Sequence, residues 1–554
     1  MKRTFLFLLV LALFLTGCNF NEKDTQNTKK NTAFYLESLP EIGEFSGKTQ
    51  GGRFYEDITY DFVPGDEYGK IIPYVGSYRF YETPKDNSWY TKMGYATYGF
   101  CTLDGRIVMD ASEKNTFVNH IQTEDGFGFY TVHREERQKE DAPDEFLPSE
   151  TLVIPDSGKW FLSLKSNSYV VNSGGGHISI VEYPGDSGEQ RVHLYDYDGK
   201  LVRTIEGTDS TGSYSQGLML VSSYVKGGYR AEFVDEQGQK VLGPYKSASD
   251  FNENGITAVS DENGAYIVNA EGERLTEYYK DFFKEFSLNM KKHVFVGRRL
   301  DNNKELDVYS DKAEYLGKVE GATYASFRFC DNGEILYYYT KFDTDEKGHS
   351  VYNSEKIVWK RLSDNSDFVN EELGVSPNSY SGTDNCFVYE DKENSRAVLL
   401  DENASVIAEI EGATQVVNST EHGEYVIFIT GEYDYRIDEQ TGKPVKDTRK
   451  THIYDSKNKK IIYSMDHAGT NAHFADRGKR FIMITVYNSD PDNMFSSLSR
   501  SWLFDTQSGK IVFEDCSQIS LYDVGEETYI NVCTDNSTAL YDENLALVRK
   551  LYFE

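Results

Sequence analysis

A strand–turn–strand unit recurs along this chain, and its repetition constrains the fold more strongly than any other feature of the sequence. Clear copies occupy residues 192–203 (VHLYDYDGKLVR), 232–242 (EFVDEQGQKVL), 266–275 (YIVNAEGERL) and 502–513 (WLFDTQSGKIVF). An Asp or Asn that starts the turn can bond the backbone that follows it, and glycine supplies the positive φ of a tight reversal. Each unit is therefore predicted to be a β-hairpin.

The spacing of the units indicates how they assemble. Residues 397–407 and 539–548 are degenerate copies without the glycine, and further copies bring the turn markers to twelve. The markers are Gly69, Gly105, Gly158, Gly199, Gly238, Gly272, Ala313, Ser366, Ala404, Asn458, Gly509 and Leu545. Their mean spacing is about 43 residues, close to the ~40–50 residues of a four-stranded propeller blade. The sequence predicts an all-β fold of β-propeller-like repeats, with about twelve hairpin units.

Two arrangements of these units remain open. Residues 276–292 could form a helix or the last strand of a blade, and they separate six markers from six. This division favours two six-bladed rings, one β-propeller-like array over residues 34–290 and a second over residues 291–554. One large propeller is the alternative, and a solenoid or stacked sandwiches would also give short strands at regular spacing.

Three segments resemble a known bacterial repeat. They are residues 98–108 (YGFCTLDGRIV), 215–221 (SQGLMLV) and 251–257 (FNENGIT). The first is similar to the core of the bacterial WG repeat, with tyrosine where the family has tryptophan, and the other two are similar to a second conserved segment of that repeat. The resemblance covers residues 95–275 and implies a repeat architecture with no catalytic residues to carry over.

The N-terminal segment predicts export and membrane attachment. Two basic residues precede an apolar run over residues 5–15, which is shorter than the ~20 helical residues that cross a bilayer. The run ends in LTGC at residues 15–18, which resembles the lipobox of bacterial lipoproteins. We therefore expect a signal peptide at residues 1–17, a lipid on Cys18 and a flexible polar tether over residues 18–33. The mature protein would be lipid-anchored to the cell membrane and face the extracytoplasmic side.

The net charge and the cysteines limit which partners, crosslinks and metal sites are expected. A formal net charge of −32 repels nucleic-acid phosphates and anionic headgroups, so no nucleic-acid partner is expected and the lipid should provide the membrane attachment. Five further cysteines are scattered and lack CxxC spacing, which predicts single buried thiols instead of a disulfide framework or zinc site. These residues are Cys101, Cys330, Cys386, Cys516 and Cys533.

Four short motifs suggest chemistry, and each departs from the pattern it would need. Residues 185–188 (GDSG) are similar to a protease nucleophile loop but lack its flanking residues, and residues 43–49 (GEFSGKT) have one residue too few between the glycines of a phosphate-binding loop. Residues 343–348 begin like a calcium loop but place lysine at a ligand position. His467 and His473 flank a turn without zinc-site spacing. No catalytic, cofactor-binding or metal site is predicted.

These features together favour a binding protein. We expect a membrane-anchored surface lipoprotein whose β-propeller displays loops for binding a protein or glycan in the cell envelope, because no nucleophile, base and orienting group occur in a recognisable arrangement. The alternative is an envelope hydrolase or lyase with carboxylates in the propeller channel. A third class is a sensor or assembly factor of the envelope.

Overall fold

The computed structural model describes the chain as a series of strand-rich segments. The described residues are 34–37, 69–81, 93–112, 115–123, 125–134, 150–164, 168–182, 191–208, 210–225, 228–286, 292–344, 350–437, 444–466, 471–476, 478–490, 493–525, 527–534 and 537–553. These segments are strands, turns and connecting coil, and none of them supplies a helix that could cross a membrane.

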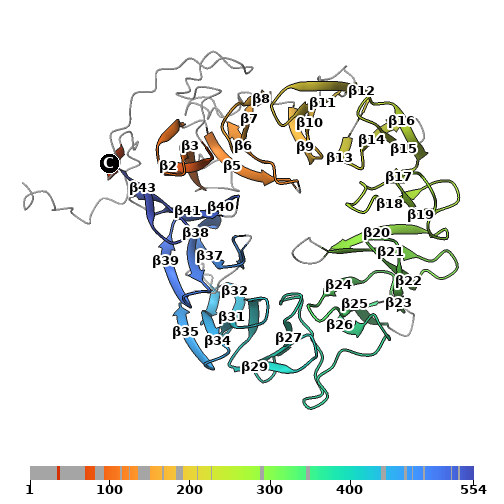
Figure 1. Ribbon diagram of the computed structural model, residues 1–554. Coiled ribbons are helices and arrows are strands. Elements are labelled where there is room, and N and C mark those ends of the chain that lie inside the picture. Colours follow the sequence, from red (N-terminus) through yellow and green to blue (C-terminus); the bar gives the residue numbers. More distant parts are fainter. Residues whose placement is uncertain are drawn as a thin grey trace, which may run out of the picture.

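In the described part of the chain, eleven antiparallel sheets follow one another around one ring, and each sheet is one blade (Figure 1). Blade 1 consists of β2 (Ile71–Tyr81), β3 (Met93–Thr102) and β4 (Ile107–Ser112), and blade 2 of β5 (Asn115–Gln122), β6 (Gly128–Arg134), β7 (Glu150–Pro155) and β8 (Leu162–Leu164). Blade 3 consists of β9 (Ser168–Gly174), β10 (His177–Glu182), β11 (Arg191–Asp196) and β12 (Leu201–Glu206), and blade 4 of β13 (Ser210–Ser215), β14 (Leu218–Val225), β15 (Gly228–Val234) and β16 (Lys240–Tyr245). Blade 5 consists of β17 (Ser247–Ala248), β18 (Ile256–Ser260) and β19 (Ala265–Asn269), and blade 6 of β20 (Asp281–Phe286), β21 (His293–Arg298), β22 (Glu305–Ser310) and β23 (Tyr315–Glu320).

The second half of the ring continues the same pattern. Blade 7 consists of β24 (Ser326–Phe329), β25 (Ile335–Thr344) and β26 (Ser350–Arg361), and blade 8 of β27 (Phe387–Asp391), β28 (Arg396–Leu400) and β29 (Val406–Glu411). Blade 9 consists of β30 (Gln415–Ser419), β31 (Tyr425–Thr430), β34 (Lys450–Asp455) and β35 (Lys460–Met465), and blade 10 of β36 (Asn471–Phe474), β37 (Phe481–Asp490), β38 (Asn493–Asp505) and β39 (Lys510–Cys516). Blade 11 consists of β40 (Gln518–Val524), β41 (Glu527–Cys533), β42 (Ser537–Tyr541) and β43 (Leu547–Phe553). The ribbon of β32 (Tyr433–Ile437) and β33 (Pro444–Asp447) connects β31 to β34 in blade 9, and β1 (Phe34–Glu37) pairs with the outer edge of β43.

The turns predicted from the sequence repeat set the period of the ring. Ten of the twelve markers have positive φ, including the non-glycine residues Ala313 (63°), Ala404 (62°) and Leu545 (63°). In the two least regular units, the positive φ lies one residue away from the marker, at Asn365 and Lys459. Eleven of these turns follow or join the last strands of the eleven blades, whereas Gly69 precedes β2. The fold class is thus confirmed, with one large ring.

Alternating residues build the core between neighbouring blades. Along β11, Val192 and Leu194 are buried while His193 between them is partly exposed. They pack with Val181 of the same blade and with Tyr214 and Met219 of blade 4. A blade's apolar face is therefore covered by the next blade, as the period-two pattern of a strand requires.

The ring closes where blade 11 meets blade 1. Asn531 of β41 donates from Nδ2 to the carbonyl of Pro73 (2.7 Å), and its Oδ1 accepts from the Val75 amide (3.4 Å). The Thr538 hydroxyl donates to the Val75 carbonyl at 2.6 Å, and Arg549 donates to the Gly105 carbonyl at 2.9 Å. These side chains bond blade 11 to blade 1, and one apolar cluster runs through blades 11, 1 and 2.

A division into two rings is not what the structure shows. Residues 290 and 291 lie between β20 and β21, which are paired neighbours in blade 6. The candidate helix over 276–292 contains the innermost strand of that blade, β20, with Tyr279 buried just before it. Phe282 and Phe283 point to opposite faces of a strand, so the aromatic residues here serve two faces of a sheet and not one face of a helix.

The WG-like segments at 215–221 and 251–257 occupy corresponding turns in blades 4 and 5. Ser215 and Gln216 donate side-chain hydrogen bonds to the carbonyls of Asn252 (3.2 Å) and Glu253 (3.0 Å). The repeated segments are therefore in contact with each other, one blade apart.

Candidate functional site

A pocket of about 360 Å³ lies on the inner side of the ring near its closure. Its walls come from β5 of blade 2, β36 of blade 10 and β40 of blade 11, with Tyr98 of β3 in blade 1. Of these strands, β5 and β40 are seen on the inner side of the ring in Figure 1, and β36 is the corresponding edge strand of its sheet. Residues more than 400 positions apart in the sequence therefore share one concave surface, which is where a binding site is expected in a large ring.

A hydrogen-bonded group of side chains lies along β40 in the pocket. Gln518 and Ser520 point to the same face of the strand, and Gln518 donates from Nε2 to the hydroxyls of Tyr98 (3.0 Å) and Ser520 (3.1 Å). Tyr522 lies on the same face and is buried, and burial raises its pKa well above the usual value. Its phenol stays protonated, so this wall of the pocket is polar and uncharged.

His120 is the pocket residue with a carboxylate partner. Its Nε2 lies 2.9 Å from Oδ1 of Asp156, a buried residue at the end of β7, and its ring lies over Tyr130 with 4.6 Å between centroids. The Asp156 carbonyl also accepts from the Ile71 amide of blade 1 at 2.7 Å. Gly128 makes room for this carboxylate, because a Cβ there would lie 2.0 Å from Oδ2 of Asp156. The Asp156 contacts fix the imidazole ring in the pocket wall.

Apolar groups and a second histidine complete the lining. Phe117 is 60% exposed at the pocket, and Phe474 and Met483 line it from blade 10. His473 of β36 also lines it, and burial holds the pKa of this histidine below its usual value, so its imidazole is neutral at pH 7. The pocket thus presents aromatic faces beside amide, hydroxyl and imidazole groups.

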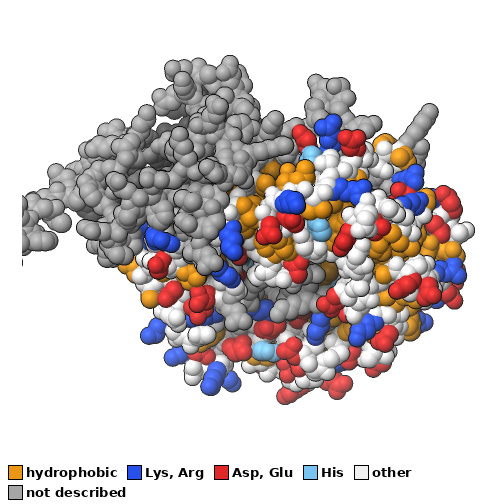
Figure 2. Space-filling model, turned by 45° about the horizontal axis from the view of Figure 1, so that its top comes forward, with side chains coloured by type: hydrophobic (Ala, Val, Ile, Leu, Met, Phe, Trp, Pro, Cys, Tyr) orange, Lys and Arg blue, Asp and Glu red, His pale blue; other side chains and the backbone are white. Residues whose placement is uncertain are grey.

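No formally charged Asp, Glu, Lys or Arg occurs among the fourteen described residues that line the pocket. The face of the ring drawn in Figure 2 differs from this lining, because acidic and basic side chains are spread over it. The usual cleavage of a glycosidic bond uses two carboxylates about 5–10 Å apart, one as acid and one as base or nucleophile. This lining offers one imidazole with a carboxylate behind it, an arrangement suited to orienting a ligand.

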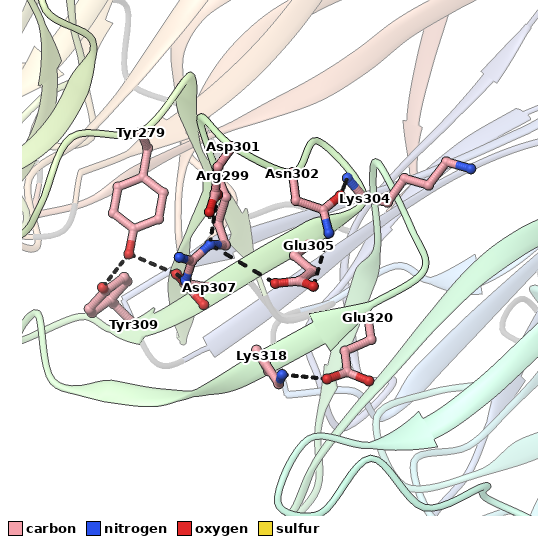
Figure 3. A network of polar contacts seen from close by, with 10 residues as sticks. All are labelled: Tyr279, Arg299, Asp301, Asn302, Lys304, Glu305, Asp307, Tyr309, Lys318 and Glu320. Carbon is pink, nitrogen blue, oxygen red and sulfur yellow. Dashed lines mark hydrogen bonds and ion pairs between the residues drawn. The ribbon is translucent and has the colours of Figure 1, made fainter.

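A second polar network lies in blade 6, away from the pocket (Figure 3). The buried Asp307 accepts from the Tyr279 hydroxyl at 2.9 Å and pairs with Arg299 at 3.3 Å, while the hydroxyls of Tyr279 and Tyr309 are 2.6 Å apart. Burial, followed by these hydrogen bonds, raises the pKa of Tyr279. The backbone of Tyr279 pairs with Ala265 of blade 5, so the network fastens blade 5 to blade 6.

The structure places some of the sequence motifs and not others. His473 lies in the pocket, whereas its neighbouring candidate His467 lies outside the described residues, as do Cys18 and residues 43–49 and 185–188. Of the calcium-like segment, residues 343 and 344 end β25 and residues 345–348 lie outside the described part. No group of three or more potential metal ligands is found within the described segments.

The remaining cysteines behave as predicted. All five are buried and free of disulfide bonds in the structure. Burial raises the pKa of Cys101, Cys330 and Cys386 to about 12, so these thiols stay protonated and unreactive.

Sequence reasoning missed the pocket residues Phe117, Asn119 and Gln518. A weak signal was present, since residues 115–122 (NTFVNHIQ) alternate, with Val118 toward the core and Phe117 and Asn119 toward the other side. Other strands such as β11 and β29 also alternate, so the pattern could not single out this strand.

Comparison with known proteins finds distant likeness only. No family model and no curated protein matches the sequence, so the resemblance to WG repeats stays a prediction. Among solved structures, this chain is similar to a eukaryotic initiation factor (13% identity, covering 63% of this chain and 86% of that chain, TM-score 0.36). It is also similar to BamB from Moraxella catarrhalis (9%, 59% and 96%, 0.25) and to the β-propeller domain of the Trilobed protease from Pyrococcus furiosus (11%, 69% and 97%, 0.27). The ring of antiparallel sheets itself identifies the fold as a β-propeller.

Proposed function

We propose that this protein is a membrane-anchored surface lipoprotein whose β-propeller binds a protein or glycan of the cell envelope through the pocket at the ring closure. The observation that carries the proposal is the pocket itself, which is concave and lined by aromatic and neutral polar groups from three inner strands. Such a mixture of apolar walls with a few fixed polar groups is typical of ligand sites. The lipobox-like sequence that ends at Cys18 supplies the proposed anchor.

Binding is better supported than cleavage at this site. The polar side chains of the pocket are held by one another, as Gln518 is by Tyr98 and Ser520, or by a buried partner, as His120 is by Asp156. Side chains held in this way lose little conformational entropy when a ligand arrives, which favours affinity. A paired acid and base, which hydrolysis of a glycan would require, is not found in the described lining.

The anchor is tested by membrane fractionation of cells that express the full chain. We expect Cys18→Ala to move the protein out of the membrane fraction, because the thiol that would carry the lipid is lost. Cys516→Ala, which changes a buried thiol of β39, is the matched control and should remain with the membranes. Equal membrane retention of the Cys18→Ala protein would contradict the lipoprotein assignment.

The binding site is tested by light-induced cross-linking in intact envelopes. A photoreactive phenylalanine analogue replaces Phe117 at the pocket or, as the control, Tyr315 on the outer strand β23, which is similarly exposed at 57%. We expect a discrete adduct with an envelope component from position 117 and none from position 315. The same adducts from both positions would contradict a specific site at the pocket.

A further inference from the structure

We propose that the pocket at the ring closure binds an uncharged saccharide, with Phe117 as the stacking surface and Asn119 and Gln518 as the hydrogen-bonding groups. This inference rests on the proposed binding function and narrows its ligand class. It assigns the ligand from the chemistry of three side chains on two inner strands.

The first argument is the absence of charge in the described lining. A ligand with phosphate or carboxylate groups is normally held by Arg or Lys, and a cation by Asp or Glu, but the described residues of this pocket include none of the four. The chain as a whole carries a net charge of −32, so a described pocket lining without Asp, Glu, Lys or Arg is a local departure from the general composition. A neutral ligand fits such a surface without leaving a charge desolvated and unpaired.

The second argument is the pairing of an aromatic face with amides. A sugar ring has C–H faces that pack on aromatic rings and hydroxyl groups that both donate and accept hydrogen bonds. Phe117 and Asn119 are two residues apart on β5, so they point to the same side of the strand, and both are exposed. A ring stacked on Phe117 would therefore have the Asn119 amide beside its edge.

The third argument is unused hydrogen-bonding capacity. Within the described residues, no hydrogen bond of the Asn119 side chain is found, and Gln518 uses only its Nε2 while its Oε1 accepts none. Gln518 is nevertheless fixed by its bonds to Tyr98 and Ser520. Its carbonyl oxygen is thus a preorganised acceptor for a ligand hydroxyl, and Asn119 offers both donors and an acceptor.

The size of the pocket agrees with this ligand class. At about 360 Å³ it lies near the lower end of the range of about 300–1,000 Å³ for small-molecule sites. A mono- or disaccharide unit suits this volume, whereas a folded protein partner needs a contact of about 800 Å² per partner. An extended peptide could instead add to the inner edge of β36 or β40 through its backbone. Saccharide binding would depend on the side chains of the pocket, whereas addition of a peptide strand would depend on the backbone. Side-chain substitutions therefore distinguish the two binding modes.

The test is calorimetric titration of the full-length protein in a detergent without a sugar headgroup. The probes are two neutral disaccharides, cellobiose and di-N-acetylchitobiose, and one acidic disaccharide that contains glucuronate. We expect saturable binding of a neutral disaccharide with Kd below about 10 mM, and no binding of the acidic one. The Kd should stay unchanged between about 0.05 and 0.5 M salt, because screening has no ligand charge to act on.

Side-chain variants locate the binding. Phe117→Ala and Gln518→Ala should each raise Kd about tenfold, through loss of the stacking surface and of the hydrogen-bond acceptor. The matched controls are Phe286→Ala, an exposed phenylalanine at the end of β20, and Gln237→Ala, in the exposed β15–β16 turn. They should bind as the unchanged protein does. Thermal unfolding of each variant confirms that the ring is intact.

Three results would overturn the saccharide assignment. They are no binding of either neutral disaccharide, binding that Phe117→Ala and Gln518→Ala leave unchanged, and preference for the acidic probe. Each can occur while the cross-link from position 117 persists, in which case the pocket binds another class of envelope ligand and the proposed function stands. Loss of the position-specific cross-link would instead refute the proposed function itself.

Discussion

Replacement of Asn531 by alanine should open the ring at one place only. Asn531 is buried on β41, and its amide bridges two backbone groups of β2, the Pro73 carbonyl and the Val75 amide. In the Asn531→Ala protein both groups lose this partner. Side chains of β41, β42 and β43 make the described hydrogen bonds from blade 11 to blade 1.

The cost follows from the geometry of the two bonds. The 2.7 Å bond to Pro73 is short and well formed, whereas the 3.4 Å bond from Val75 is long and contributes less. An unsatisfied buried polar group costs about 1–3 kcal/mol, so one strong and one weak loss sum to about 2–4 kcal/mol. Local opening at the closure should then be about 30- to 900-fold more frequent, since each 1.36 kcal/mol is a factor of ten.

Hydrogen–deuterium exchange read by mass spectrometry measures this directly. Peptides from β2 and β41 should exchange faster by the stated factor, while peptides from blades 4 to 8 keep their rates. Asn418→Ala is the matched control, because Asn418 of β30 donates a bond of the same length, 2.7 Å, to Ala472 of blade 10, a neighbour joined through the chain. It should leave β2 unchanged. A uniform increase over all blades, or no change in β2, would refute the closure argument.

Three further outcomes are expected. Gly128→Ala should lower the urea midpoint of unfolding, because the new Cβ would lie 2.0 Å from Asp156 Oδ2 and overpacking of this kind costs about 1–3 kcal/mol. Adding Asp156→Ala should recover part of that loss. Strictly additive effects of the two substitutions would contradict the clash. Burial lowers the pKa of three histidines in the folded protein. Because the unfolded chain then binds more protons below its usual pKa of about 6.5, stability should fall as pH drops from 7 through 6 to 5, and His452→Gln should flatten this slope in thermal unfolding. The three histidines are His293, His452 and His473. Iodoacetamide should leave the five buried thiols unmodified in the native protein and label them all in denaturant, and mass spectrometry that finds rapid native labelling of Cys101 would contradict its buried, protonated state.

The repeat was predictable because one backbone requirement recurs in every blade. A turn that needs positive φ leaves a glycine at positions such as Gly199 and Gly238, and the interval between them gives the blade length. The error of one residue at Asn365 and Lys459 arose where no glycine marks the position. The spacing of the turns could not predict the number of rings. The sequence of a hairpin is local and does not indicate which other blades its own blade contacts.

The pocket could not be predicted for a related reason. Phe117 precedes His473 and Gln518 by hundreds of residues, and it meets them because the ring closes between blades 11 and 1. Closure depends on contacts such as that of the Asn531 side chain with the Pro73 carbonyl. In the sequence, Asn531 looks like any other polar residue of a strand. Local patterns specify the blades, whereas the site is a property of the assembled circle.

The pairing of β1 with β43 determines how mechanical force would enter the molecule. Any pull on the N-terminal segment reaches the ring first at four residue pairs, from Phe34 with Phe553 to Glu37 with Lys550, at the outer edge of blade 11. The chain continues from β1 to β2, so tension arrives at β2 only after β1 has peeled away. The short strand β1 should therefore separate from β43 under load before the Asn531 contact between β41 and β2 is strained.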